Sequence, residues 1–153
     1  MKIGIIGVGM LGEAVALNLL NLGFQVSVYN RTKEKVSKVE KNGAIVMNSP
    51  KLVADNSELI IIIVKDAVAV KEVSFGKEGI IESKNKKLIV ADMSTIEPTE
   101  SKEIADNFKQ KQIQKLEIPV MGGPNVAITG KLVMMASGPK NSYEQCRTIF
   151  EKI

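Results

Sequence analysis

The sequence predicts an α/β domain in which a doubly wound, mainly parallel sheet is covered by helices on both faces. Short apolar runs rich in β-branched residues alternate along the 153 residues with segments of helical periodicity, and this alternation is typical of parallel strands joined by crossover helices. Residues 60–64 are apolar at every position, as expected for a central strand buried on both sides. A glycine-rich turn at residues 7–12 separates the first apolar run from the first helical segment.

The individual elements follow from the same periodicities. The expected strands are residues 2–6, 25–29, 44–46, 58–64, 87–91 and 115–120, with a later β-rich run at 131–137. The expected helices are residues 11–22, 33–42, 50–54, 67–74, 98–111 and 140–152, each beginning near Ser, Thr, Asp or Asn or with proline in its first turn. Gly23 and Gly43 stand where helix C-caps belong. Because no repeat or flexible linker interrupts the pattern, we expect residues 1–153 to form one domain.

The composition argues against several classes of protein. The chain has no histidine and one cysteine, Cys146, which leaves no histidine-dependent catalytic triad, no disulfide within the chain and no multi-cysteine metal site. The net charge of +4 is spread along helical faces, so we expect no nucleic-acid partner. The apolar runs fall far short of the roughly 20 residues that span a membrane, and the first run is too short for a signal peptide. We therefore expect a cytoplasmic protein without bound metal or membrane contact.

The last predicted helix carries an apolar stripe, formed by Tyr143, Cys146, Ile149, Phe150 and Ile153. One interpretation is that the stripe packs on the sheet of this domain, as any flanking helix would. The other is that a further strand and domain follow and cover part of it.

The glycine-rich turn has the pattern GxGxxG, made by Gly7, Val8, Gly9, Met10, Leu11 and Gly12. In the strand–turn–helix context it predicts a Rossmann-type dinucleotide-binding loop. Gly7 would permit the tight turn, Gly9 would let a pyrophosphate approach the backbone, and Gly12 would allow close helix packing. The helix N-terminus would offer free N–H groups to the phosphates. The alternative is a glycine-rich turn without a ligand.

The residues after the second predicted strand indicate which dinucleotide is bound. Sites that prefer NAD carry Asp or Glu there for the ribose 2′-hydroxyl, whereas this chain has Asn30, Arg31 and Thr32. A guanidinium pairs with a 2′-phosphate that a carboxylate would repel, and Asn and Thr side chains donate further hydrogen bonds. NADP(H) is therefore expected in preference to NAD(H). The alternative is that Arg31 is a solvated charge and Thr32 only caps the next helix.

Two further segments complete a resemblance to a known family. Residues 92–98 read Asp-Met-Ser-Thr-Ile-Glu-Pro, and residues 119–124 read Pro-Val-Met-Gly-Gly-Pro and continue to Ala127, Gly130 and Leu132. With the glycine loop and residues 30–32, these segments resemble the β-hydroxyacid dehydrogenase family. That family includes 3-hydroxyisobutyrate dehydrogenase, 2-hydroxy-3-oxopropionate reductase and, more distantly, 6-phosphogluconate dehydrogenase.

The resemblance implies a cofactor site and a substrate site at the carboxyl ends of the strands. Cofactor contacts would include Val64, Lys65, Ser94 and Thr95, and a small carboxylate substrate would meet Ser94, Met121, Gly122 and Gly123. Alternatively, the hydroxyls of Ser94 and Thr95 cap the helix that begins at Pro98, and the two glycines form a plain turn.

The chain departs from the family pattern at the expected substrate loop. Met121 stands where the family has a serine that helps to hold the substrate carboxylate, and Glu117 stands where aspartate is usual. An altered substrate, an imine-type substrate or a lost activity would each be consistent with a flexible apolar side chain at position 121.

The family's catalytic lysine lies on a long helix beyond the segment that this sequence matches. Lys65 and Lys131 do not correspond to it, so no catalytic residue is expected in the chain. The family's all-helical C-terminal domain, which often supplies dimer contacts, is not expected within these residues either. The implied reaction is hydride transfer between NADP(H) and a small β-hydroxyacid, with this chain as the cofactor-binding domain. A stand-alone NADP(H)-binding module and a pyrroline-5-carboxylate-type reductase are the alternatives.

Overall fold

The molecule is built on a six-stranded parallel sheet with the strand order β3-β2-β1-β4-β5-β6. The computed structural model describes residues 1–85 and 87–153. The strands are β1 (Ile3–Ile6), β2 (Val26–Tyr29), β3 (Ile45–Val46), β4 (Leu59–Ile62), β5 (Ile89–Asp92) and β6 (Gln114–Glu117). The chain moves outward from β1 to β3, returns to β4 beside β1, and moves outward again to β6. This doubly wound order confirms the predicted Rossmann-type α/β class.

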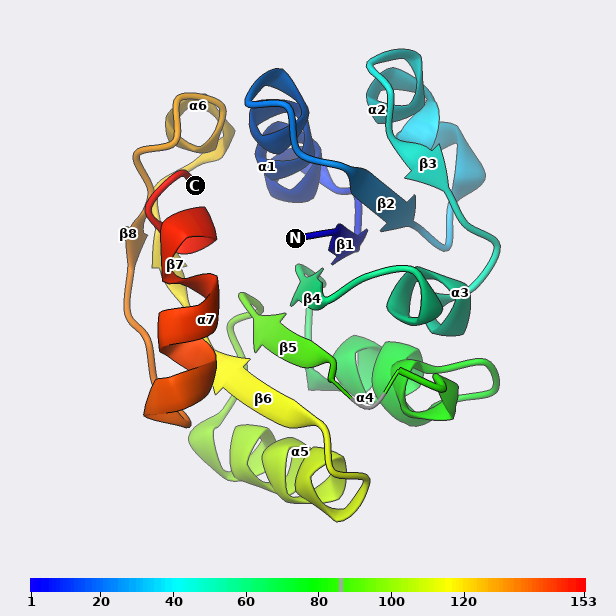
Figure 1. The fold of residues 1–153 in the computed structure, drawn as a ribbon, viewed down its shortest axis with the longest axis vertical. Helices are drawn as coiled ribbons and strands as arrows, with labels where there is room; N and C mark the ends of the chain where they lie inside the picture. The colour runs from blue at the N-terminus through cyan, green and yellow to red at the C-terminus, as the bar shows by residue number, and fades with distance from the viewer. Residues whose placement is uncertain (86) are drawn as a thin grey trace.

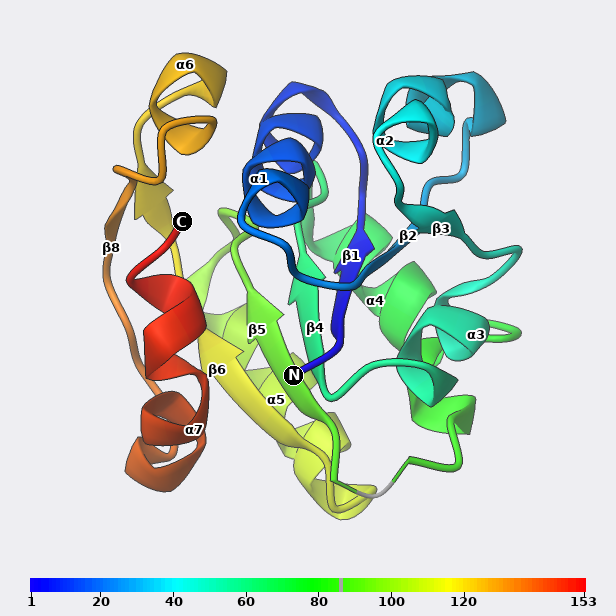
Figure 2. The ribbon, with the colours of Figure 1, turned by 45° about the horizontal axis from the view of Figure 1, so that its top comes forward.

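Helices cover both faces of the sheet, as Figures 1 and 2 show. One face is covered by α1 (Met10–Asn21), by η1 (Lys33–Val36) with α2 (Ser37–Lys41), and by α7 (Lys140–Phe150). The other face is covered by α3 (Pro50–Asp55), α4 (Ala67–Phe75), η2 (Ile80–Glu82) and α5 (Pro98–Gln110). The sheet therefore separates two apolar cores.

The sequence explains why these elements form. Each residue of β1 and β4 is buried. This burial agrees with their apolar sequences, which are typical of central strands. In α5 the buried positions are Ser101, Ile104 and Phe108, which lie on one helical face. Phe108 packs against Phe75 of α4 with ring centroids 5.0 Å apart, and this contact joins the two helices.

The expected strand 115–120 is wrong in its second half. β6 ends at Glu117, and β7 (Val120–Met121) instead pairs antiparallel with β8 (Val133–Met134) in a separate two-stranded sheet. Pro119 between them has no N–H to donate to a continuing ladder. The short helix α6 (Pro124–Ala127), which the sequence analysis did not predict, connects β7 to β8.

The apolar stripe of the last helix packs within this domain. Cys146, Ile149, Phe150 and Ile153 are buried in the same core as Leu116 of β6, which confirms the local interpretation of the stripe. None of the helices in residues 1–85 and 87–153 is long and apolar enough to cross a membrane.

Candidate functional site

A cleft of about 310 Å³ lies at the carboxyl ends of β1, β2 and β4. It sits where the strand order reverses between β1 and β4, the place at which open α/β sheets bind their ligands. Its lining comes from the ends of β1 and β2, the glycine loop, the turns after β2 and β4, the elements η1 and α3, and α4 with the residues after it. The lining residues are Ile6, Gly7, Gly9, Tyr29, Asn30, Arg31, Thr32, Lys35, Pro50, Ile63, Val64, Lys65, Ala69, Glu72, Val73 and Lys77.

The glycines of the loop differ in what surrounds them. Gly7 has a φ of +102°, and a Cβ atom there would lie 2.0 Å from the carbonyl oxygen of Ile63. A Cβ atom on Gly12 would lie 2.0 Å from the carbonyl oxygen of Gly7. A Cβ atom on Gly9 would meet no heavy atom of the described chain within 4 Å, apart from its immediate neighbours. The fold therefore requires Gly7 and Gly12, whereas the space beside Gly9 is open.

The N-terminus of α1 faces this open space without a side-chain cap. Gly9 is the N-cap residue, and no side chain in the described part of the molecule accepts a hydrogen bond from the first turn. The N–H groups of Gly9, Met10, Leu11 and Gly12 have no partner within the helix itself. Uncapped N–H groups at the positive end of a helix dipole attract anions, and phosphates in particular.

Asn30 holds the glycine loop in place, a role that the sequence analysis missed. Its Oδ1 accepts a hydrogen bond of 2.9 Å from the N–H of Val8, and its Nδ2 donates to the carbonyl oxygen of Thr32 at 2.8 Å. The N–H of Val8 is thus already engaged, and Asn30 joins the loop to the end of β2. Short polar side chains commonly bond to nearby backbone in this way, but the partner 22 residues away is visible only in the fold.

Arg31 and Thr32 stand at the edge of the cleft. The Arg31 side chain is 76% exposed, and its Nη1 lies 3.8 Å from Oε2 of Glu72 on α4, a weak surface contact. Thr32 occupies the N-cap position of η1 but makes no capping bond with its side chain, so its hydroxyl is free to face the cleft. Lys35 and Lys77 also line the cleft, and sequence reasoning found neither.

The turn after β4 brings Val64 and Lys65 into the lining. Nζ of Lys65 lies 3.1 Å from Oδ2 of Asp66. Asp66 caps α4 by accepting a 2.8 Å bond from the N–H of Ala69, and this bond, helped by Lys65, lowers the pKa of the Asp66 carboxyl. The Asp66 carboxyl therefore stays ionised next to the cleft residue Lys65.

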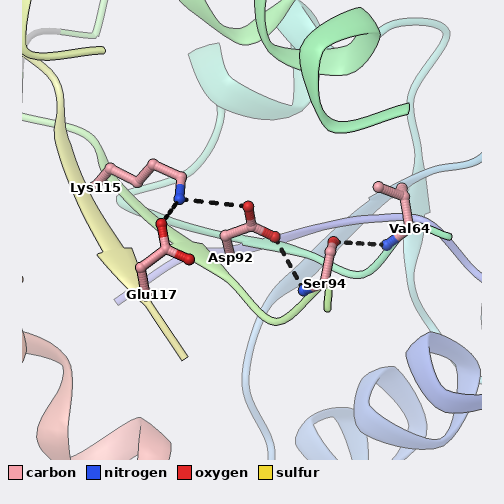
Figure 3. A network of polar contacts seen from close by, with 5 residues as sticks. All are labelled: Val64, Asp92, Ser94, Lys115 and Glu117. Atoms are coloured by element: carbon pink, nitrogen blue, oxygen red, sulfur yellow. Dashed lines mark hydrogen bonds and ion pairs between the residues drawn. The ribbon is translucent and has the colours of Figure 1, made fainter. Parts of the chain in front are cut away.

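Ser94 belongs to a polar network that joins the ends of β4, β5 and β6 (Figure 3). Its Oγ accepts a 3.1 Å bond from the N–H of Val64, and its own N–H donates to Oδ1 of Asp92 at 3.0 Å. Oδ2 of Asp92 lies 3.4 Å from Nζ of Lys115, which also contacts the Glu117 carboxylate. Burial raises the pKa of Asp92, and the charge of Lys115 opposes this shift.

A second cavity, of about 460 Å³, lies beyond β5 and β6 against α5. It contains Ser94 and Thr95 in its lining, and neither caps α5, whose N-cap residue is Glu97. The other lining residues are Ile96, Pro98, Ser101, Lys102, Ala105, Lys115, Glu117, Pro119, Ser137 and Gly138.

The expected substrate loop is not part of either lining in the described chain. Met121 is 56% exposed. Gly122 has a φ of +129°, and a Cβ atom there would lie 2.7 Å from Cδ2 of Leu132. Gly123 is the N-cap residue of α6. The structure thus places these three residues at the start of a turn and short helix, apart from the cavity that Ser94 lines.

Comparison with known proteins agrees with this geometry. The family model described as the NAD binding domain of 6-phosphogluconate dehydrogenase matches residues 2–153. The chain belongs to this family. The predicted resemblance of this chain to 3-hydroxyisobutyrate dehydrogenase is thereby confirmed.

Individual members of the family match almost the whole chain. An uncharacterized oxidoreductase, YkwC of Bacillus subtilis (strain 168), is 39% identical over 97% of this chain and 51% of its own length. A probable mitochondrial 3-hydroxyisobutyrate dehydrogenase of Dictyostelium discoideum is 31% identical over 97% of this chain and 46% of its own length. The solved structure of Psf3 in complex with NADP+ and 2-OPP is 27% identical, has a TM-score of 0.94, and is matched over 98% of this chain and 53% of that chain. The chain thus spans about half the length of these relatives.

Proposed function

We propose that this chain is the NADP(H)-binding part of an oxidoreductase that acts on a small β-hydroxyacid. The observation that carries the proposal is the uncapped N-terminus of α1 beside the open space at Gly9. A helix N-terminus with free N–H groups suits the pyrophosphate of a dinucleotide. The preference for NADP(H) rests on Arg31 and Thr32, which follow β2 where NAD sites carry a carboxylate.

The residues of the cleft fit this cofactor. The N–H groups of the α1 first turn would hold the pyrophosphate, and Arg31 would pair with the 2′-phosphate, aided by Lys35. Val64 and Lys65 would line the path toward the nicotinamide, with Ser94 and Thr95 beyond them. When bound, the nicotinamide supplies the hydride chemistry that amino-acid side chains lack.

The substrate class follows from family membership and from one relative. The Dictyostelium protein is a probable 3-hydroxyisobutyrate dehydrogenase, and the proposed reaction is hydride exchange with the hydroxyl-bearing carbon of such an acid. We propose that residues 1–153 form the cofactor domain and bind NADP(H). The substrate carboxylate would meet Ser94, Met121, Gly122 and Gly123.

Calorimetric titration with NADP(H) and NAD(H) tests the proposal. We expect the chain to bind NADP(H) about ten-fold or more tightly than NAD(H), because charge-assisted hydrogen bonds contribute about 1.5–3 kcal/mol. Arg31→Ala should remove this preference and leave NAD(H) binding unchanged. Arg147→Ala is the matched control, since Arg147 pairs with Glu144 and Glu151 on α7. Equal affinities in the unchanged chain, or no binding of either nucleotide, would contradict the proposal.

A further inference from the structure

The orientation of the cleft assigns its two sides to the two halves of a dinucleotide. Arg31, at the end of β2, marks the adenosine side, and the N-terminus of α1 lies between β1 and β4. A dinucleotide whose pyrophosphate lies at that N-terminus extends its other half over β4 and β5. The loops that follow these two strands carry Val64 and Ser94.

These two loops are joined by one chain of hydrogen bonds. The N–H of Val64 donates to Oγ of Ser94, and the N–H of Ser94 donates to Oδ1 of Asp92. Asp92 is fully buried, at 0% exposure. The geometry of both loops therefore depends on a carboxylate from which water is excluded.

The neighbouring strand places a second carboxylate opposite the first. In the register of β5 and β6, Glu117 is the direct partner of Asp92. Like charges in directly opposed positions destabilise a sheet. Lys115, two residues earlier on β6, extends its ammonium between them, and its side chain is 1% exposed (Figure 3). A buried ammonium is costly unless it is paired, and here it is paired with both carboxylates.

We infer that Lys115 is a positioning residue whose ammonium balances the buried carboxylate of Asp92, so that Asp92 holds Ser94 and Val64 in place for the nicotinamide half of the cofactor. The inference rests on the proposed function, because it concerns the same cleft. Burial raises the pKa of Asp92 and Lys115 counteracts this, in agreement with the geometry. Lys115 acts through Asp92 and is not itself expected to touch the cofactor.

The test compares two ligands that share the adenosine half. NADPH carries the nicotinamide, whereas 2′,5′-ADP carries only the adenosine with its 2′- and 5′-phosphates. In Lys115→Met we expect NADPH binding to weaken about ten-fold, 2′,5′-ADP binding to stay unchanged, and the amide protons of Val64 and Ser94 to exchange faster. Lys109→Met is the matched control, since this exposed lysine of α5 lines neither cavity and should change none of these readouts.

A double variant keeps the inference falsifiable where Lys115→Met alone does not fold. Asp92→Asn combined with Lys115→Met retains an amide oxygen for the Ser94 N–H and needs no counter-charge, so it should fold and bind NADPH as the unchanged chain does. A double variant that folds but no longer binds NADPH more tightly than 2′,5′-ADP would overturn the inference. So would equal losses for both ligands in Lys115→Met, or an unchanged chain that binds NADPH no more tightly than 2′,5′-ADP. If the unchanged chain binds neither ligand, the proposed function itself fails.

Discussion

At the scale of single residues, side chains in the cleft are held by the chain itself before any ligand arrives. Asn30 is the main example, because its amide group joins the glycine loop to the turn after β2. The sequence predicted that Asn30 lies beside the cofactor, and it does line the cleft. Its hydrogen bonds could not be predicted, since they depend on how closely two loops approach. A similar limit applies to Lys35 and Lys77, which reach the cleft from different elements.

Replacing Asn30 tests its structural role. Asn30→Ala leaves the N–H of Val8 without its acceptor, and we expect the free energy of unfolding to fall by about 1–3 kcal/mol. Asn56→Ala is the control, because this exposed asparagine also donates to a carbonyl oxygen, that of Leu52, but accepts no loop N–H. Urea unfolding of both variants gives the comparison. If both variants lose the same small amount of unfolding free energy, the hydrogen bond to Val8 does not stabilise the loop.

At the scale of elements, periodicity predicted most helices and strands well. α5 and α7 follow from apolar positions that repeat along one helical face. The segment 115–120 was less predictable, because β7 is defined by its pairing with β8, which lies 12 or more residues further along. The sequence also carried no signal for the ion pairs between Asp92, Lys115 and Glu117, because these contacts depend on the register between β5 and β6.

The pH dependence of stability tests the environment at the end of β5. Burial raises the pKa of Asp92 above its ordinary value of 3.8, so the folded chain binds this proton more tightly than the unfolded chain. The contribution of Asp92 to stability is therefore present below pH 3.8 and is lost as the pH rises through the folded pKa. Asp92→Asn does not titrate, so its stability relative to the unchanged chain should increase as the pH rises through that window. If the free energy of unfolding of Asp92→Asn, relative to the unchanged chain, stays constant or decreases as the pH rises, Asp92 does not have this buried environment.

The thiol of Cys146 reports on the packing of α7. Burial raises the pKa of this thiol to about 11, and the side chain lies in the core between α7 and the sheet. Because only the thiolate is alkylated, we expect iodoacetamide at pH 8 to react about a hundred-fold more slowly with the folded chain than with the chain in urea. Mass spectrometry of timed samples measures both rates. Equal rates would mean that α7 leaves the sheet readily.

At the scale of the whole molecule, the doubly wound order places a cleft where the two halves of the sheet meet. The alternation of strands and helices was sufficient to predict this arrangement, because parallel crossovers are right-handed and ligands bind at the reversal of strand order. The sequence did not predict that the cavity beside Ser94 excludes the loop at Met121, Gly122 and Gly123. That loop begins at the end of β7 and leads through α6 to β8, and the position of this strand pair relative to the main sheet is a property of the assembled fold.

We propose that the space beside Gly9 is kept open for a dinucleotide. Gly9 has a φ of −82°, which any residue adopts, and a Cβ atom there meets no described heavy atom within 4 Å apart from its neighbours. We therefore expect Gly9→Val to lower the free energy of unfolding by no more than about 1 kcal/mol, the cost of a poorer N-cap residue, while NADP(H) affinity falls about a hundred-fold or more. Gly12→Ala is the contrasting variant, because its Cβ would lie 2.0 Å from the Gly7 oxygen, and it should lose about 1–3 kcal/mol of stability.

Calorimetric titration of Gly9→Val with NADPH, beside its urea unfolding curve, is the most direct measurement. A stable variant that no longer binds NADPH is the predicted result. A stable variant that binds NADPH as tightly as the unchanged chain would show that the glycine loop is a turn and not the cofactor site.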